Sequence, residues 1–149
     1  MSTTREQAMT ALYNLLITAY SFGYTSRRPL PQTDLTTVEM PAMILIDDDE
    51  SHTRRGQNVP AIRTITCAAW IFTSDASDPS SIPATTLNNI LDAIDPVSGG
   101  VLKPAVGSGN FQTLGGLVSN CWVEGKITKD PGVLGKLGFA HVPMHILIP

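Results

Sequence analysis

The sequence predicts an α+β domain in which a mostly antiparallel β-sheet carries two helices on one face. Three observations support this prediction. Apolar residues near the N-terminus recur with the period of a helix, the C-terminal segment alternates apolar with polar residues, and the predicted elements follow the order helix, strand, strand, helix, strand, strand. The chain has 149 residues, the length of one domain. We therefore expect residues 1–149 to form a single domain.

The first predicted helix runs from about Thr4 to Phe22. Its apolar residues recur at intervals of three and four: Met9, Leu12, Tyr13, Leu16, Ile17 and Tyr20. Thr3 and Glu6 have the spacing of a capping box, and Gly23 is suited to end the helix. The helix has almost no charged face, so it lies either deep in its own core or with its second side against a neighbouring subunit.

Two strands are predicted in the first half of the chain, after a loop over Tyr24–Pro41. Ala42–Ile46 is a short apolar run, typical of a buried strand, and it leads into a loop that begins with Asp47, Asp48, Asp49 and Glu50. Ile62–Phe72 is rich in β-branched and aromatic residues and is apolar on both faces. This composition predicts a long central strand.

The second half predicts one helix and two further strands. A polar turn over Asp75–Pro83 precedes a short helix with an apolar face made of Leu87, Ile90, Leu91 and Ile94, and Asp95-Pro96 ends it. Ser98–Gly116 contains six glycines, which predicts an extended flexible loop. Residues 117–127 alternate around Trp122, residues 130–132 suit a turn, and residues 140–148 alternate to the end of the chain.

Composition excludes several classes of protein. With Lys+Arg 10, Asp+Glu 13 and a net charge of -3, the chain has no excess of basic residues to bind the phosphates of nucleic acid. Cys67 and Cys121 are too few for a disulfide scaffold and too far apart for a CxxC pair, which leaves the redox compartment open. Residues 8–22 are too short to span a membrane and show no convincing cleavage site, so we expect neither a membrane span nor a signal peptide.

The acidic run Asp47–Glu50 is the first candidate for metal chemistry, because carboxylates suit Mg²⁺. A nucleotide site would also need a GxxxxGK[ST] loop, which is absent, and consecutive acids in an extended chain point to alternate sides. We therefore expect a solvated or inter-subunit acidic loop. A small metal-dependent hydrolase that uses this run with His52 is the less favoured alternative.

His141 and His145 have the spacing of the two histidines in HExxH, but no Glu follows His141 and Pro143 lies between them. In a strand the two rings would lie roughly 13 Å apart and could not hold one zinc ion by themselves. We expect them on the solvent-facing or subunit-facing side of an edge strand, since Pro143 has no N–H. GxSxG and GxGxxG motifs are absent, so no catalytic, cofactor-binding or metal-binding residue is predicted.

Five stretches, taken in order, resemble the tail terminator family of tailed bacteriophages (minor tail protein U-like), whose members cap the tail tube and join it to the head. They are the TREQAMTALYNLL helix, the MPAMILI strand with its charged loop, the RTITCAAWIF strand, TLGG leading into LVSNCWVEGKI, and the closing HVPMHILIP strand. The resemblance covers most of the chain. Neck and tail-completion proteins of the same head-tail interface are the nearest alternative.

The resemblance implies a structural, non-enzymatic subunit of the virion, at the head-proximal end of the tail, that is assembled in the host cytoplasm. It implies a ring, typically a hexamer. The partners would be further copies of the chain, the tail-tube protein, a tail sheath where the tail has one, and the head connector or neck protein. DNA would pass through the lumen without specific binding, and neither a cofactor nor a membrane would be involved.

The residues expected at the lumen or at a subunit interface are Asp47, Asp48, Asp49, Glu50, Arg54, Arg55 and Trp122. An acidic lumen would repel the phosphates of sliding DNA. The acids would otherwise pair with Arg54 or Arg55 of a neighbouring copy. Trp122, on a polar strand face, is either an interface anchor or covered by loops of its own chain.

Overall fold

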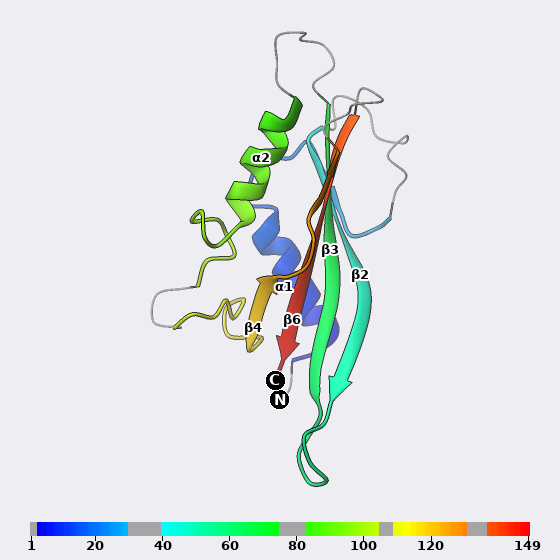
Figure 1. Ribbon diagram of the computed structural model, residues 1–149, viewed down its shortest axis with the longest axis vertical. Coiled ribbons are helices and arrows are strands. Elements are labelled where there is room, and N and C mark those ends of the chain that lie inside the picture. Colours follow the sequence, from blue (N-terminus) through cyan, green and yellow to red (C-terminus); the bar gives the residue numbers. More distant parts are fainter. Residues whose placement is uncertain (1–2, 30–39, 75–82, 105–108, 131–136) are drawn as a thin grey trace.

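Two helices and six strands make up the part of the chain that the computed structural model describes, residues 3–29, 40–74, 83–104, 109–130 and 137–149. The helices are α1 (Arg5–Leu16) and α2 (Pro83–Ile94), and the strands are β1 (Tyr24–Ser26), β2 (Ala42–Thr53), β3 (Ile62–Ser74), β4 (Asn120–Val123), β5 (Thr128–Asp130) and β6 (Leu137–Ile148). All six strands join one sheet, and both helices lie on the same side of it (Figure 1). The predicted α+β class is confirmed.

The sheet has the order β1-β2-β3-β6-β4, with β5 also paired to β6. β1 and β2 are parallel, and every other pair is antiparallel. The prediction that the last strand is an edge strand is wrong, because β6 has β3 on one side and β4 and β5 on the other. Pro143 is tolerated because its carbonyl accepts a hydrogen bond from Glu124 N (3.3 Å) where the chain passes between β4 and β5, so the missing N–H faces a break in the ladder.

The main core lies between the helices and one face of the sheet, which we call the inner face. It takes alternate residues of β6, as the sequence predicts, and all five are buried: Ala140, Val142, Met144, Ile146 and Ile148. Met9, Leu12 and Leu16 of α1 and Leu87, Ile90 and Ile94 of α2 pack against them. Apolar burial on this scale is the main stabilising contribution to such a fold.

α1 is shorter than predicted and begins one residue later. Thr4, not Thr3, is the N-cap, and its capping box is completed by Gln7 instead of Glu6. The helix ends at Leu16, and the hydroxyl of Thr18 donates a hydrogen bond to the Leu15 carbonyl (2.6 Å), which offers the backbone an alternative to a further turn. Only one side of α1 is buried.

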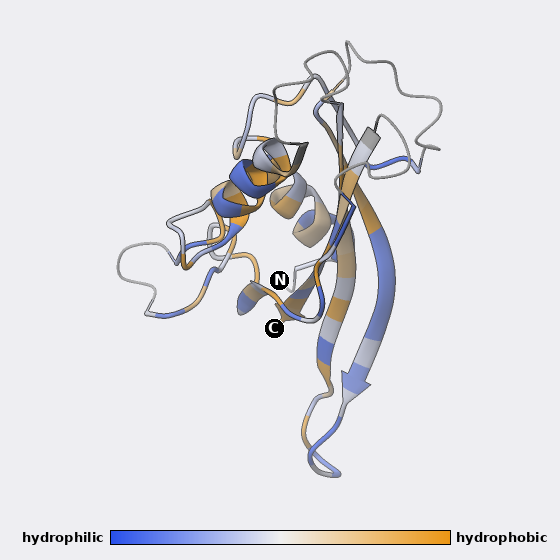
Figure 2. Cartoon of the chain, turned by 45° about the horizontal axis from the view of Figure 1, so that its top comes forward, coloured by the Kyte–Doolittle hydropathy of each residue, from blue (hydrophilic) through white to orange (hydrophobic). Residues whose placement is uncertain are grey.

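The acidic residues lie in a strand, so the predicted acidic loop is wrong. β2 continues through Thr53 because β3 pairs with it as far as Thr53 opposite Ile62. The register shifts between Asp47 and Glu50, which leaves Asp48 and Asp49 in a bulge. Figure 2 shows the change from the hydrophobic to the hydrophilic half of β2.

The connections also differ from the prediction in part. β1 lies inside the segment expected to be a loop, and β4 is shorter than the alternation predicts because the chain leaves the sheet at Gly125, whose φ is 107°. The described part of the glycine-rich segment packs against the core, with Leu102 and Leu114 buried. The turns predicted over residues 75–82 and 131–132 lie outside the described residues. No helix in the described part of the chain is long and apolar enough to cross a membrane.

Candidate functional site

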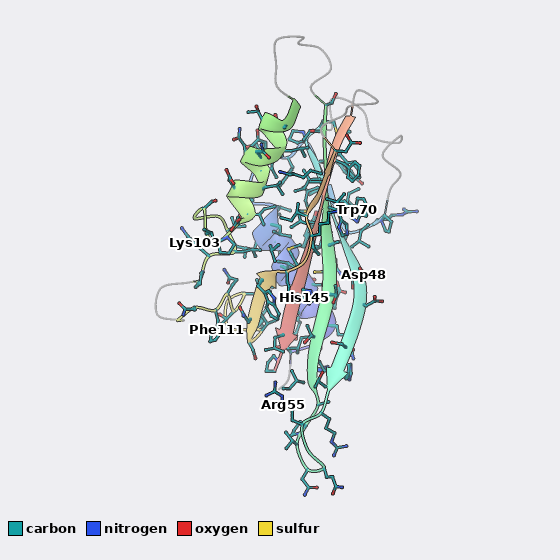
Figure 3. All side chains as sticks on the ribbon, viewed as in Figure 1. Asp48, Arg55, Trp70, Lys103, Phe111 and His145 are labelled. Carbon is teal, nitrogen blue, oxygen red and sulfur yellow. The ribbon has the colours of Figure 1, made fainter. Side chains whose placement is uncertain are left out.

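The acidic run of β2 divides into two pairs of residues with different environments. Asp47 and Glu50 each contact an arginine of the same chain. Arg27 Nη2 donates to Asp47 Oδ1 at 3.2 Å and the same guanidinium pairs with Glu6 of α1. The side chains of Asp48 and Asp49, in the bulge, are exposed and have no partner among the described residues, and Asp48 points away from the sheet (Figure 3).

Glu50 lies at the centre of a small ionic cluster on the inner face. Arg5 donates Nε to Glu50 Oε1 (2.5 Å) and Nη2 to Glu50 Oε2 (2.7 Å), and His52 Nε2 lies 2.6 Å from Oε2. The hydrogen bonds from Arg5 and then from His52 lower the pKa of Glu50 to about 2. Glu50 is therefore ionised throughout the physiological range, and it ties β2 to the start of α1.

Beyond Glu50, β2 and β3 continue as a projecting hairpin whose residues 51–62 are all exposed (Figure 1). We call residues 51–63 the hairpin arm. Arg54 shapes its tip, since Nε donates to the carbonyl of Gly56 (2.9 Å) and Nη2 donates to the carbonyl of Gln57. Arg55 is exposed and has no partner in the described part of the chain. Val59, also in the tip, is 49% exposed.

The face of the sheet opposite the helices, which we call the outer face, carries aromatic side chains. Trp70 lies edge-on to His141 with ring centroids 4.7 Å apart, and it stacks on Phe139 at 6.0 Å. Trp122 stacks on His145 at 5.6 Å, and Glu124 Oε2 lies 3.5 Å from His145 Nε2. All five rings are partly exposed. The ring of His145 covers part of Trp122, and the rest of the Trp122 side chain remains exposed to solvent.

The two histidines of β6 share the outer face, as the alternation predicts, but each contacts a different tryptophan. No group of three or more His, Cys, Asp or Glu residues in the described part of the chain is placed to hold a metal ion. Cys67 and Cys121 are buried free thiols. Burial raises the pKa of Cys67 to about 12 and also raises the pKa of Cys121, so both thiols are neutral at physiological pH.

The structure brings together residues that are far apart in the sequence, namely Arg5 with Glu50, Arg27 with Asp47, and Trp122 with His145. The predicted set is not one site, since Asp47 and Glu50 lie on the inner face, Arg54 and Arg55 in the arm tip, and Trp122 on the outer face. The roles of Arg5 and Arg27 were missed. The available signal was charge, because these are two of the three arginines among the first 50 residues, which contain seven acids and no lysine.

No family model matches the chain, and no curated protein matches it significantly.

Proposed function

We propose that this chain is a structural, non-enzymatic protein of the phage virion, a tail terminator. Copies of it form a ring, six-fold by the resemblance of the sequence, that caps the tail tube and joins it to the head connector. The proposal places the protein at the head-proximal end of the tail, with the tail-tube protein and the connector as its partners.

One observation carries most of this proposal, namely the composition of the outer face. Both helices cover the inner face. On the outer face Ala42, Ile44 and Phe72 are buried in a small second cluster, and no described helix lies over the rest of that face. That face presents two tryptophans, Trp70 and Trp122, together with Ile46 and Pro143, all partly exposed. Aromatic side chains with few charges are typical of the centre of protein interfaces, so this face suits contact with another subunit.

The small fraction of charged residues in the chain supports the same proposal. Charged residues make up 15% of the chain, below the usual value of about 25% for soluble domains. A chain with few charged groups gains by covering surface in an assembly, and a head-to-tail contact that closes by rotation gives a ring instead of a filament.

The experiment is a measurement of mass over a concentration series of the purified protein, by light scattering and negative-stain images, with and without assembled tail tubes. We expect ring formation, strengthened by the tubes. Trp122→Ala should weaken ring formation, whereas Val97→Ala, at a residue 93% exposed in the turn after α2, serves as the matched control and should not. A parent protein that stays monomeric at high concentration and with tail tubes would refute the proposal. Binding to connectors but not to tubes would favour a neck or tail-completion protein.

A further inference from the structure

The hairpin arm has a defined shape although all of residues 51–62 are exposed. Its strands stay paired as far as Thr53 opposite Ile62, and Arg54 holds the tip by its two hydrogen bonds to main-chain carbonyls. At its base, Arg5 fixes Glu50 to α1. A projecting segment that is ordered before it meets a partner loses little conformational entropy on binding.

The charge of the arm is opposite to that of the rest of the chain. Residues 51–63 contain three arginines and no Asp or Glu, so the arm carries +3. Since the whole chain carries -3, the remaining residues carry -6. Arg55 and Arg63 have no partner within the described ranges. A second copy of this chain therefore offers acidic partners that these two arginines lack among the described residues of their own copy.

The acidic acceptor is found at an open edge of the sheet. β1 pairs with β2 only over Ala42–Ile44, so beyond Ile44 that edge of β2 has no strand partner in the described residues. Asp48 and Asp49 lie along this edge, are exposed and have no partner among the described residues, whereas the carboxylates of Asp47 and Glu50 are occupied by Arg27 and Arg5.

The arm cannot reach this edge within one chain. Arg55 follows Asp49 along the same extended strand and turn, at roughly 3.3 Å per residue, so the two side chains of one copy lie on the order of 20 Å apart. The pairing can form only between copies.

We propose that the hairpin arm of one copy docks against the open β2 edge of the next copy, where Arg55 pairs with Asp48 and Asp49. The inference rests on the proposed function, because it supplies one of the contacts between neighbours in the ring. The contact is head-to-tail, as ring closure requires. Being exposed, the pairs should weaken with added salt.

A second role for the two acids is protection of the sheet edge, since charges and bulges both prevent unwanted strand pairing. The two roles differ in their response to the sign of the charge. Asp48→Arg with Asp49→Arg would still protect the edge, because the edge stays charged, but it would repel the arm of the neighbouring copy.

The test is a charge-swap series followed by sedimentation equilibrium at low and at 0.5 M salt, an ionic strength chosen to screen exposed pairs. Arg55→Asp alone, and Asp48→Arg with Asp49→Arg, should each weaken self-association at least about fivefold at low salt. The triple variant, which carries all three substitutions, restores complementary charges and should return to within about twofold of the parent. Arg28→Asp makes the same charge change at an exposed arginine outside the arm whose side chain has no partner among the described residues, and it should have no effect.

Each other outcome is informative. If the parent assembles and Arg55→Asp changes nothing, the arm inference is wrong and the proposed function stands. If Asp48→Arg with Asp49→Arg leaves assembly intact, the two acids only protect the sheet edge and the arm inference is wrong. If the triple variant does not recover the self-association of the parent, the pairing of Arg55 with these acids is wrong. A parent that is monomeric under all conditions overturns both proposals. Loss of binding to a short DNA duplex in Arg55→Asp, with self-association unchanged, would make the arm a phosphate contact and overturn the inference.

Discussion

Arg5 and Glu50, which are 45 residues apart in sequence, form a bidentate ion pair. The pair joins the first turn of α1 to β2 at the residue before the hairpin arm begins. Planar guanidinium and carboxylate groups match each other in this geometry. The pair is exposed to solvent, so its contribution to stability is small, but it links the start of α1 to the base of the arm.

The first prediction concerns pH. Glu50 has a pKa of about 2 in the folded chain, against an ordinary value of 4.5. A lowered folded-state pKa gives stability that is complete above the ordinary value and is lost as the pH falls from about 4.5 through 2. Thermal melts of the parent and of Glu50→Gln should therefore differ at pH 5 to 7, and the difference should vanish toward pH 2.

The matched control for this pH experiment is Asp92→Asn in α2, which removes an exposed carboxylate without an arginine partner in the described residues. Its melting temperature should follow that of the parent at every pH. A Glu50→Gln curve that stays parallel to the parent down to pH 2 would show that the pair with Arg5 does not form in solution.

The second prediction concerns the two faces of β6. Ile146 is 0% exposed and lies opposite Ile65 and Cys121, so Ile146→Asp buries a charge without a partner and should cost several kcal/mol. We expect insoluble or unfolded protein. His145→Asp, one residue away on the partly exposed outer face, should leave the fold intact by circular dichroism. Equal damage from both substitutions would mean that the register is wrong.

The third prediction concerns Gln112, which is 9% exposed and holds the glycine-rich segment together. Its Nε2 donates to the carbonyls of Val101 (3.2 Å) and Lys103 (2.7 Å), and its Oε1 accepts from Leu114 N (3.0 Å). Gln112→Leu leaves these groups without their partner and should lower the free energy of unfolding by about 2 to 4 kcal/mol. Urea denaturation measures the change, and Asn110→Ala, at an exposed neighbour, should change it by less than about 0.5 kcal/mol.

The fourth prediction concerns the two thiols. Because Cys67 and Cys121 are buried and their pKa values are raised, neither should react with a thiol reagent in the folded protein at pH 8. Both should react in denaturant. Rapid labelling of either cysteine under native conditions would show that the inner face opens readily to solvent.

The elements that the sequence predicts well are those with a strong local pattern. α2, β3 and the alternation of β6 follow from the spacing of their apolar residues, since one face of each must be buried against the rest of the core. The elements predicted badly depend on distant partners. The acidic half of β2 looks like a loop in the sequence because nothing local pairs it, whereas β3 supplies the ladder and Arg5 and Arg27 supply opposite charge.

The sequence by itself determined the α+β class, the helix and strand types of the main elements, and which residues of β6 enter the core, because these depend on periodicity and burial. The tertiary structure decided the rest. It placed β6 inside the sheet, divided the four acids into two held by arginines and two without a partner in the described residues, and set the rings of Trp122 and His145 together on the outer face. These arrangements depend on contacts between residues far apart in the chain, and no local pattern in the sequence encodes them.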